Sequence, residues 1–114
     1  MIHQLRIYEI FEHNKAAFHD RFREHAARIM RTYGFHILAM WEAKTEQRTE
    51  CVYLLAWPDE AALRSAWAQF MADEEWKEIK RLTSAQHGDL VGEIEDRVLV
   101  LTGYSPSIIQ SAQA

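Results

Sequence analysis

Two polar residues near the start of the chain carry side chains suited to proton and anion chemistry. Arg6 and Tyr8 are separated by one residue in the segment 3–11. Residues two apart in an extended segment project from the same face, so both side chains would meet one ligand. A tyrosine hydroxyl can move a proton, and a guanidinium can hold an anionic ligand or a developing enolate oxygen. Because a buried arginine needs a partner, the alternative for Arg6 is an ion pair with Glu95 or Asp96.

His25 is the histidine that the sequence pattern places on a buried face. It lies beside Phe22 and Ile29 on the apolar stripe of an expected helix. Imidazole titrates near neutral pH, so His25 is a candidate general base; the alternative is a hydrogen-bonded histidine of the core. The histidines lack the spacing of three or four residues that puts two ligands on one helix face, and CxxC and HExxH motifs are absent. We therefore expect no metal ion and no other cofactor.

Aromatic residues form a second group of candidate binding residues. Trp41 and Tyr53 share parity across an expected hairpin, and a register that pairs Lys44 with Glu50 would set them opposite each other. Such a pair can hold a flat apolar ligand; the alternative is ordinary core packing. Cys51 has no histidine near it in the sequence, so we interpret it as an inert buried thiol.

The composition restricts the protein to ordinary globular classes. Of 114 residues, 48% are hydrophobic and 26% are charged, with a net charge of −4. These values argue against disorder, and an acidic balance without a basic cluster argues against nucleic-acid binding. No apolar run reaches the roughly 18 residues that span a membrane, and the N-terminus lacks a secretory pattern. A single cysteine favours a reducing compartment, and we expect a cytoplasmic protein.

Hydrophobic periodicity predicts four strands separated by helices. Alternating or continuously apolar sequence marks strands at residues 3–11, 35–44, 51–57 and 94–101. The order β-α-β-β-α-β with right-handed crossovers predicts an α+β, ferredoxin-like antiparallel sheet with strand order 4-1-3-2. We expect one domain over residues 1–104 and a C-terminal tail over residues 105–114.

The helix ends are marked by capping residues. Asn14 is the expected N-cap of the first helix, and Gly34 ends that helix because glycine tolerates the left-handed conformation. The second helix opens at Asp59 and is interrupted near Ala72, where Asp73 caps a new segment.

The strand sequences also predict a partner for the sheet. Helices cover one face of a ferredoxin-like sheet, and the other face normally alternates polar and apolar residues. The segment 51–57 is apolar almost throughout, and residues 98–101 are continuously apolar, so both faces would need cover. A second copy packed sheet against sheet provides it, and we expect a homodimer. The alternative is a monomer whose C-terminal tail covers the sheet.

Short segments along nearly the whole chain form an ordered series. They are Leu5–Tyr8, Phe22–Ala26, Tyr33–Phe35, Met40–Trp41, Val52–Leu54, Trp57, Asp73–Trp76 and Tyr104–Pro106. Together they resemble the NIPSNAP family, within the dimeric α+β barrel superfamily. Two positions depart from the family pattern: Gln4 stands where a Glu often precedes the Leu-Arg pair, and Glu74 or Glu75 stands where a Pro is common.

The resemblance implies a ferredoxin-like subunit and a back-to-back dimer, but no general activity. Relatives in the wider superfamily include cofactor-free monooxygenases, haem-degrading enzymes, isomerases and cyclases, which use a cavity between sheet and helices. The family pattern draws attention to Arg6, Tyr8, His25, Trp41, Tyr53 and Trp76.

From the residue pattern and the resemblance together, we expect a homodimer whose subunits each bind a small hydrophobic or anionic organic molecule in a cavity between sheet and helices. In an enzyme of the cofactor-free monooxygenase or isomerase type, Tyr8 or His25 would move a proton and Arg6 would hold the oxyanion. Trp41, Tyr53 and Trp76 would then hold the body of the ligand. The alternative is a non-catalytic dimer that binds a ligand or a partner protein.

Overall fold

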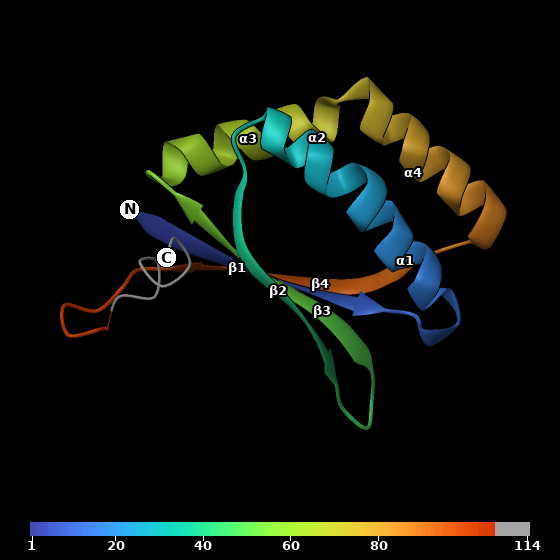
Figure 1. Ribbon diagram of the computed structural model, residues 1–114, viewed down its shortest axis with the longest axis horizontal. Helices are drawn as coiled ribbons and strands as arrows, with labels where there is room; N and C mark the ends of the chain where they lie inside the picture. Colours follow the sequence, from blue (N-terminus) through green and yellow to red (C-terminus); the bar gives the residue numbers. More distant parts are fainter. Residues whose placement is uncertain (107–114) are drawn as a thin grey trace.

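A four-stranded antiparallel sheet forms one layer of the subunit. The computed structural model describes residues 1–106, and the predicted tail lies from residue 107 onward outside the described residues. The strands are β1 (Ile2–Ile10), β2 (His36–Lys44), β3 (Thr49–Trp57) and β4 (Val91–Leu99). Their spatial order is β2-β3-β1-β4, which is the predicted order, and each neighbouring pair is antiparallel (Figure 1).

The helices form the second layer, on one face of the sheet (Figure 1). They are α1 (Lys15–Arg21), α2 (Ala27–Thr32), α3 (Glu60–Ala72) and α4 (Glu74–His87), with a 3₁₀ turn at Glu12–Asn14. A π-helical turn, Phe22–Ala26, joins α1 to α2 in one continuous run, and such turns are frequent at functional sites. The fold is therefore the predicted ferredoxin-like α+β arrangement. No helix among residues 1–106 has the length and apolar character needed to cross a membrane.

Three of the predicted capping residues lie at helix ends as expected: Asp59 and Asp73 begin helices, and Gly34 follows the end of one. The side chains of Asp59 and Asp73 accept hydrogen bonds from the backbone N–H groups of Ala62 and Trp76, both at 2.8 Å. Gly34 follows the end of α2 with a φ of 88°, which only glycine adopts without strain. Asn14 stands at the predicted N-cap position of α1, but its side chain accepts no hydrogen bond from that helix, so this part of the prediction was wrong.

Asn14 instead holds the loop between α4 and β4 against the start of α1. Its buried side-chain nitrogen donates to the carbonyl oxygens of His87 at 3.0 Å and Asp89 at 2.8 Å. The two backbone acceptors come from the far end of the chain, so no local sequence pattern indicates them.

The β2–β3 hairpin differs from the predicted register by one residue. Lys44 pairs with Thr49, so Met40 lies opposite Tyr53, and Trp41 lies opposite Val52. The turn contains four residues, 45–48, and the backbone N–H of Thr45 donates to Arg48. Because the side-chain period of a strand is two, a shift of one residue moves Trp41 to the sheet face that Tyr53 does not occupy.

We call the sheet face turned away from the helices the outer face. Alternation along β1 and β3 places four partly exposed apolar side chains there, since their neighbours Arg6, Tyr8 and Tyr53 face the helices. These are Leu5, Ile7, Val52 and Leu54. The same face carries Trp41 of β2, which is 52% exposed.

The fourth strand gives the outer face a different character from the one predicted. β4 runs from Val91 to Leu99, so Val100 and Leu101 lie beyond it. Its outward residues include Glu95 and Arg97, which form an ion pair at 2.9 Å. The sheet is thus apolar on both faces at β3 but charged on the outer face at β4.

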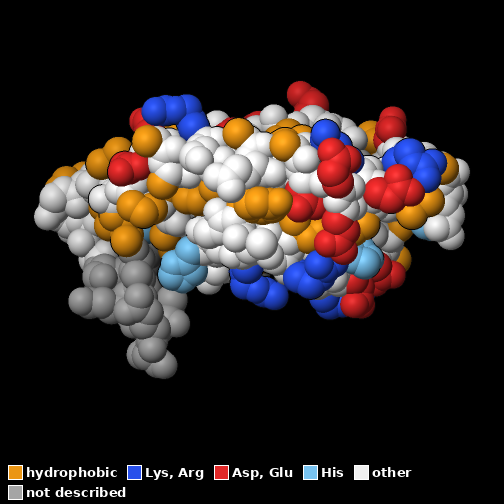
Figure 2. All heavy atoms as spheres, turned by 90° about the horizontal axis from the view of Figure 1, so that it is seen from above, with side chains coloured by type: hydrophobic (Ala, Val, Ile, Leu, Met, Phe, Trp, Pro, Cys, Tyr) orange, Lys and Arg blue, Asp and Glu red, His pale blue; other side chains and the backbone are white. Residues whose placement is uncertain are grey.

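The hydrophobic core lies between the two layers. Its most enclosed members are aromatic and aliphatic side chains from both layers, including Ile10, Met30, Tyr53, Leu55, Trp57 and Phe70. The solvent side of the helices carries acidic, basic and hydrophobic side chains interspersed (Figure 2). The helical face is therefore an ordinary solvated surface, and the interlayer space is where a site can form.

Candidate functional site

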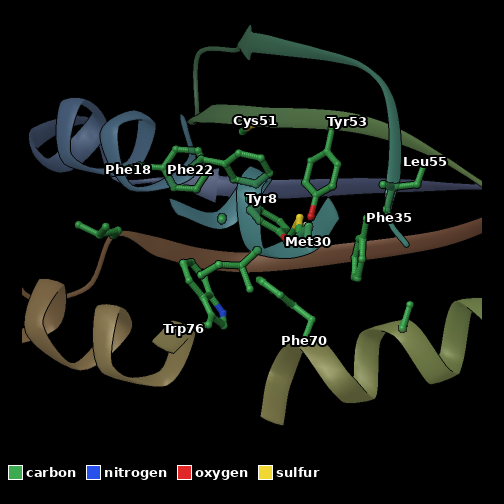
Figure 3. Packing of buried hydrophobic residues seen from close by; sticks show 14 of the residues in the cluster. Tyr8, Phe18, Phe22, Met30, Phe35, Cys51, Tyr53, Leu55, Phe70 and Trp76 are labelled. Carbon is green, nitrogen blue, oxygen red and sulfur yellow. The ribbon is translucent and has the colours of Figure 1, made fainter. Parts of the chain in front are cut away.

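A cavity of about 240 Å³ lies between the sheet and the helices. Most of its lining is apolar and comes from all four helices, β1 and β4; examples are Phe18, Phe22, Met30, Phe70, Trp76 and Ile94. Figure 3 shows Phe70 and Trp76 projecting from α3 and α4 towards the sheet, where Tyr8 and Tyr53 lie. A mostly apolar cavity with a few polar groups is the usual form of a small-molecule site.

Tyr8 is the polar centre of this cavity. Its hydroxyl lies 2.6 Å from the hydroxyl of Tyr53 and accepts a hydrogen bond from Arg6 Nη2 at 3.1 Å. Tyr53 is fully buried behind Tyr8, and the two rings meet edge to face at 5.4 Å. Burial and the proximity of Tyr8 raise the pKa of Tyr53 well above its ordinary value. Tyr53 therefore stays a neutral hydroxyl that fixes the orientation of Tyr8.

Arg6 connects the tyrosines to the edge of the sheet. Its Nη1 donates to Asp96 of β4 at 3.1 Å, so the predicted ion pair is present. Its guanidinium carbon lies 4.2 Å from the centroid of the Trp67 ring, a cation–π distance. Burial acts to lower the pKa of Arg6, but Tyr8 and Tyr53 outweigh it and raise that pKa. Arg6 is a permanent cation beside the Tyr8 hydroxyl.

Gln4, two residues before Arg6 on β1, fixes the side chains around Arg6. Its side-chain oxygen accepts from the indole nitrogens of Trp57 at 2.9 Å and Trp67 at 2.8 Å, and its nitrogen donates to Asp96 at 2.9 Å. One amide thus fixes two tryptophans and the carboxylate that pairs with Arg6. A glutamate, which is common at this position in the family, would place a second negative charge beside Asp96. The glutamine of this chain avoids that repulsion.

The structure brings together four of the six predicted site residues. Arg6, Tyr8 and Trp76 line the cavity, and Tyr53 supports Tyr8 from behind. Trp41 lies outside it, at a shallow groove near His19 and Cys51, because of the hairpin register.

His25 also lies outside the cavity. It sits in the π-helical turn next to the buried Ala26, and its ring faces the groove between α1 and α4. Its Nδ1 is 3.4 Å from Arg28 Nη2. Its expected position on the buried stripe was wrong, because the turn directs Phe22 and Ala26 to the core and leaves His25 on the flank of the helix.

Two charged cavity residues have no counterpart among the predicted site residues. Arg21 and Lys80 both line the cavity, from α1 and α4. A signal was present in the sequence, since Arg21 follows Phe18 by three residues and Lys80 follows Trp76 by four. These spacings place each cation on the same helix face as a core aromatic residue.

Cys51 behaves as predicted for an inert thiol. It is a free, buried cysteine, and burial raises its pKa to about 11. A thiol with that pKa is almost entirely protonated at neutral pH, so it is a poor nucleophile. Within residues 1–106, no three His, Cys, Asp or Glu side chains lie close enough together to hold a metal ion.

The fold is shared with solved structures of low sequence identity. An uncharacterised NIPSNAP domain protein from Burkholderia xenovorans superposes with a TM-score of 0.77 at 17% identity, covering 94% of this chain and 100% of that one. A NIPSNAP family protein from Agrobacterium tumefaciens gives a TM-score of 0.78 at 17% identity, covering 92% and 96%. A cofactor-independent oxygenase from Streptomyces nogalater gives 0.52 at 16% identity, covering 93% and 97%.

The sequence itself matches one family over nearly its whole length. No curated protein matches the chain. The model of the NIPSNAP family matches residues 3–106, a range that contains every residue of the cavity. The chain therefore belongs to the NIPSNAP family.

Proposed function

We propose that each subunit binds a small, mostly apolar organic molecule in the cavity, with an oxygen atom of that molecule beside Tyr8 and Arg6. The observation that carries the proposal is the placement of the Tyr8 hydroxyl, hydrogen-bonded to Arg6 and Tyr53, at an apolar cavity of about 240 Å³. An apolar core cavity of about 150 Å³ binds benzene. The cavity therefore has room for one aromatic ring with a short substituent.

The polar group suits chemistry at a carbonyl or enolate oxygen. Arg6 places positive charge next to the Tyr8 hydroxyl, so a negative oxygen bound there would be stabilised by the guanidinium. Tyr8 can exchange a proton with that oxygen. Cofactor-free oxygenation or isomerisation of an activated carbonyl compound is the reaction type that this arrangement supports. The likeness of the fold to the cofactor-independent oxygenase from Streptomyces nogalater supports the same choice.

One observation favours the alternative, a binding subunit without catalysis. No His, Asp or Glu of residues 1–106 lines the cavity; its ionisable residues are Arg6, Tyr8, Arg21 and Lys80. A carboxylate or imidazole is the usual base for removing a proton from carbon near neutral pH. A substrate in this cavity would have to be acidic already, whereas a ligand that is only bound needs no base.

We further propose that two copies pair through the outer face in the cytoplasm. Leu5, Ile7, Val52 and Leu54 give the middle of that face an apolar surface that a second copy would cover. The free buried Cys51 supports the reducing location.

Filling the cavity tests the binding function. Hydrocinnamide, a phenyl ring on a two-carbon chain ending in a neutral amide, has the size that the cavity admits and carries no charge. Ala26 is fully buried and lines the cavity, so Ala26→Leu adds three carbon atoms to that space. Ala27→Leu is the matched control, because Ala27 is a neighbour in the chain and faces a different groove.

We expect hydrocinnamide to bind the wild type and Ala27→Leu with similar affinity, and Ala26→Leu at least about tenfold more weakly. Binding is measured by NMR titration of the tryptophan indole signals. Equal binding by all three proteins would place the ligand elsewhere and reject the proposal.

A further inference from the structure

Two cations at the cavity lack the ion-pair partners that neighbouring cations have. Arg23, two residues after Arg21, pairs with Asp20, and Arg81, next to Lys80, pairs with Glu78 at 2.6 Å. Arg21 and Lys80 form no ion pair with any carboxylate of residues 1–106. Both line the cavity, and Arg21 also borders the groove between α1 and α4.

Trp76 brings these two cations to one end of the cavity. The guanidinium carbon of Arg21 lies 5.3 Å from the centroid of the Trp76 ring, and the Lys80 ammonium nitrogen lies 5.8 Å from it. The residues come from α1 and α4, which are far apart in sequence. Both cations are therefore held against one buried aromatic side chain by two separate helices.

The pair is electrostatically unfavourable while it has no counter-ion. Burial lowers the pKa of Arg21, partly opposed by Tyr8. Burial, together with the charges of Arg21 and Lys77, lowers the pKa of Lys80. Half-buried like charges without a partner destabilise each other, and a bound anion would relieve that cost.

The surroundings restrict the kind of anion that would fit. Apart from its ionisable residues, the lining of the cavity is aromatic and aliphatic, with Phe18, Phe22 and Phe70 beside Trp67 and Trp76. The space has room for one ring and a short chain. A carboxylate is small and planar, and a guanidinium recognises it with two parallel hydrogen bonds.

We propose that Arg21 and Lys80 form the anion-binding end of the cavity, and that the ligand is a small aromatic carboxylic acid. Its carboxylate lies between the two cations, its ring lies among the phenylalanines, and its remaining end faces Tyr8 and Arg6. This inference rests on the proposed function, because it names the class of molecule that the cavity binds.

Two probes of equal shape separate the charge from the ring. Hydrocinnamate carries the carboxylate, and hydrocinnamide carries a neutral amide in its place. NMR titration of the full-length protein gives an affinity for each probe. The variants are Arg21→Met and Lys80→Met, which keep an apolar stem and remove the charge. The controls are Arg23→Met and Arg81→Met, which remove one charge each from the same helices outside the cavity.

The wild type should bind hydrocinnamate about tenfold more tightly than hydrocinnamide, as expected for a charge-assisted contact. Arg21→Met and Lys80→Met should each remove most of that preference, and the two controls should keep it. Hydrocinnamide should bind the wild type and the two controls alike, and Arg21→Met and Lys80→Met should weaken it less than they weaken hydrocinnamate. The hydrocinnamide binding that remains also shows that each variant is folded around its cavity.

Each failure has a different meaning. If the wild type binds acid and amide equally, or if the controls lose the preference as much as the cavity variants do, the anion end is rejected while the cavity remains a binding site. If the wild type binds neither probe, the proposed function and this inference are both overturned.

Discussion

At the scale of single residues, the Tyr8 hydroxyl connects the cavity to the buried interior. It contacts Arg6 on the cavity side and Tyr53 on the core side. Removing it leaves the fully buried Tyr53 hydroxyl without its partner, and an unpaired buried hydroxyl is costly. The Tyr8–Tyr53 contact should therefore matter for stability as well as for chemistry.

Tyr8→Phe should lower the free energy of unfolding by about 1–3 kcal/mol, the cost of one unpaired buried polar group. Urea denaturation followed by tryptophan fluorescence measures the change. Tyr104→Phe removes the same atom from a side chain that is 88% exposed, and it should change stability by less than about 0.5 kcal/mol. Equal changes in the free energy of unfolding for the two substitutions would show that the Tyr8–Tyr53 contact does not stabilise the fold.

Strand parity was enough to predict the polar part of the site, and it failed where an exact register was needed. Arg6 and Tyr8 share a face because they are two residues apart, and Asp96 pairs with Arg6 as one of two predicted partners. The predicted face of Trp41 is wrong, because the length of a turn decides the register and a polar stretch does not distinguish a turn of four residues from one of five.

At the scale of elements, the α3–α4 junction positions Phe70 and Trp76 at the cavity. Asp73 stands between the two helices and accepts hydrogen bonds from the backbone N–H of Trp76 at 2.8 Å and from the Tyr33 hydroxyl at 2.6 Å. The second contact ties the junction to the end of α2. Phe70 and Trp76 then stack at a centroid distance of 5.1 Å.

The charge of Asp73 makes this junction sensitive to acid. The hydrogen bond from Tyr33, with that from the Trp76 backbone, lowers the pKa of Asp73 below its ordinary 3.8. A carboxyl with a lowered pKa in the folded state stabilises the fold fully above its ordinary pKa. That contribution is lost as the pH falls through the lowered value.

Asp73→Asn should keep the helix cap, since asparagine caps as well as aspartate, but lose the charge. The wild type should exceed it in stability at pH 6, and the difference should shrink as the pH falls below 3.8. Asp73→Ala loses the cap as well and should cost about 1–2 kcal/mol at pH 6. Urea denaturation across pH provides the measurement. A difference between wild type and Asp73→Asn that is constant with pH would contradict the assignment.

The sequence predicted where the helices begin and end, but not which side chains of the first helix face the core. Asp59, Asp73 and Gly34 act locally, so their types at those positions indicate where helices start and stop. The orientation of His25 depends on a π-helical turn, which breaks the regular 3.6-residue repeat. A helical wheel drawn from sequence assumes that repeat, and it therefore misplaced His25.

At the scale of the whole molecule, no helix of residues 1–106 covers the outer face of the sheet (Figure 1). Its middle is apolar at β1 and β3, and its hairpin end is charged. There Arg48 bonds to Glu50 at 2.8 Å and to Glu93 at 3.1 Å, with Glu9 and Glu95 within 4.0 Å. The apolar middle and the charged end together restrict how a second copy can pack, because the acidic groups of two copies would repel each other.

Leu54→Glu tests the proposed dimer. A carboxylate in the middle of the outer face would be buried without a partner on association, so the variant should be a monomer at micromolar concentration while the wild type is a dimer. Leu82→Glu makes the same change on the solvent side of α4, where the side chain is 53% exposed, and should remain dimeric. Light scattering after gel filtration gives the mass of each protein. A monomeric wild type would reject the pairing outright.

The interlayer cavity is the proposed ligand site. Two of the four tryptophans, Trp67 and Trp76, line it, whereas Trp57 is buried beside Gln4 and Trp41 lies at another groove. The indole N–H signals, assigned with single Trp→Phe variants, therefore distinguish the cavity from the groove at Trp41.

A ¹H–¹⁵N correlation spectrum recorded during titration with hydrocinnamide is the most direct measurement. We predict saturable shifts of the Trp67 and Trp76 indole signals, with the Trp41 signal unmoved. Shifts confined to Trp41, or no shift of Trp67 and Trp76 at saturating probe, would contradict the account.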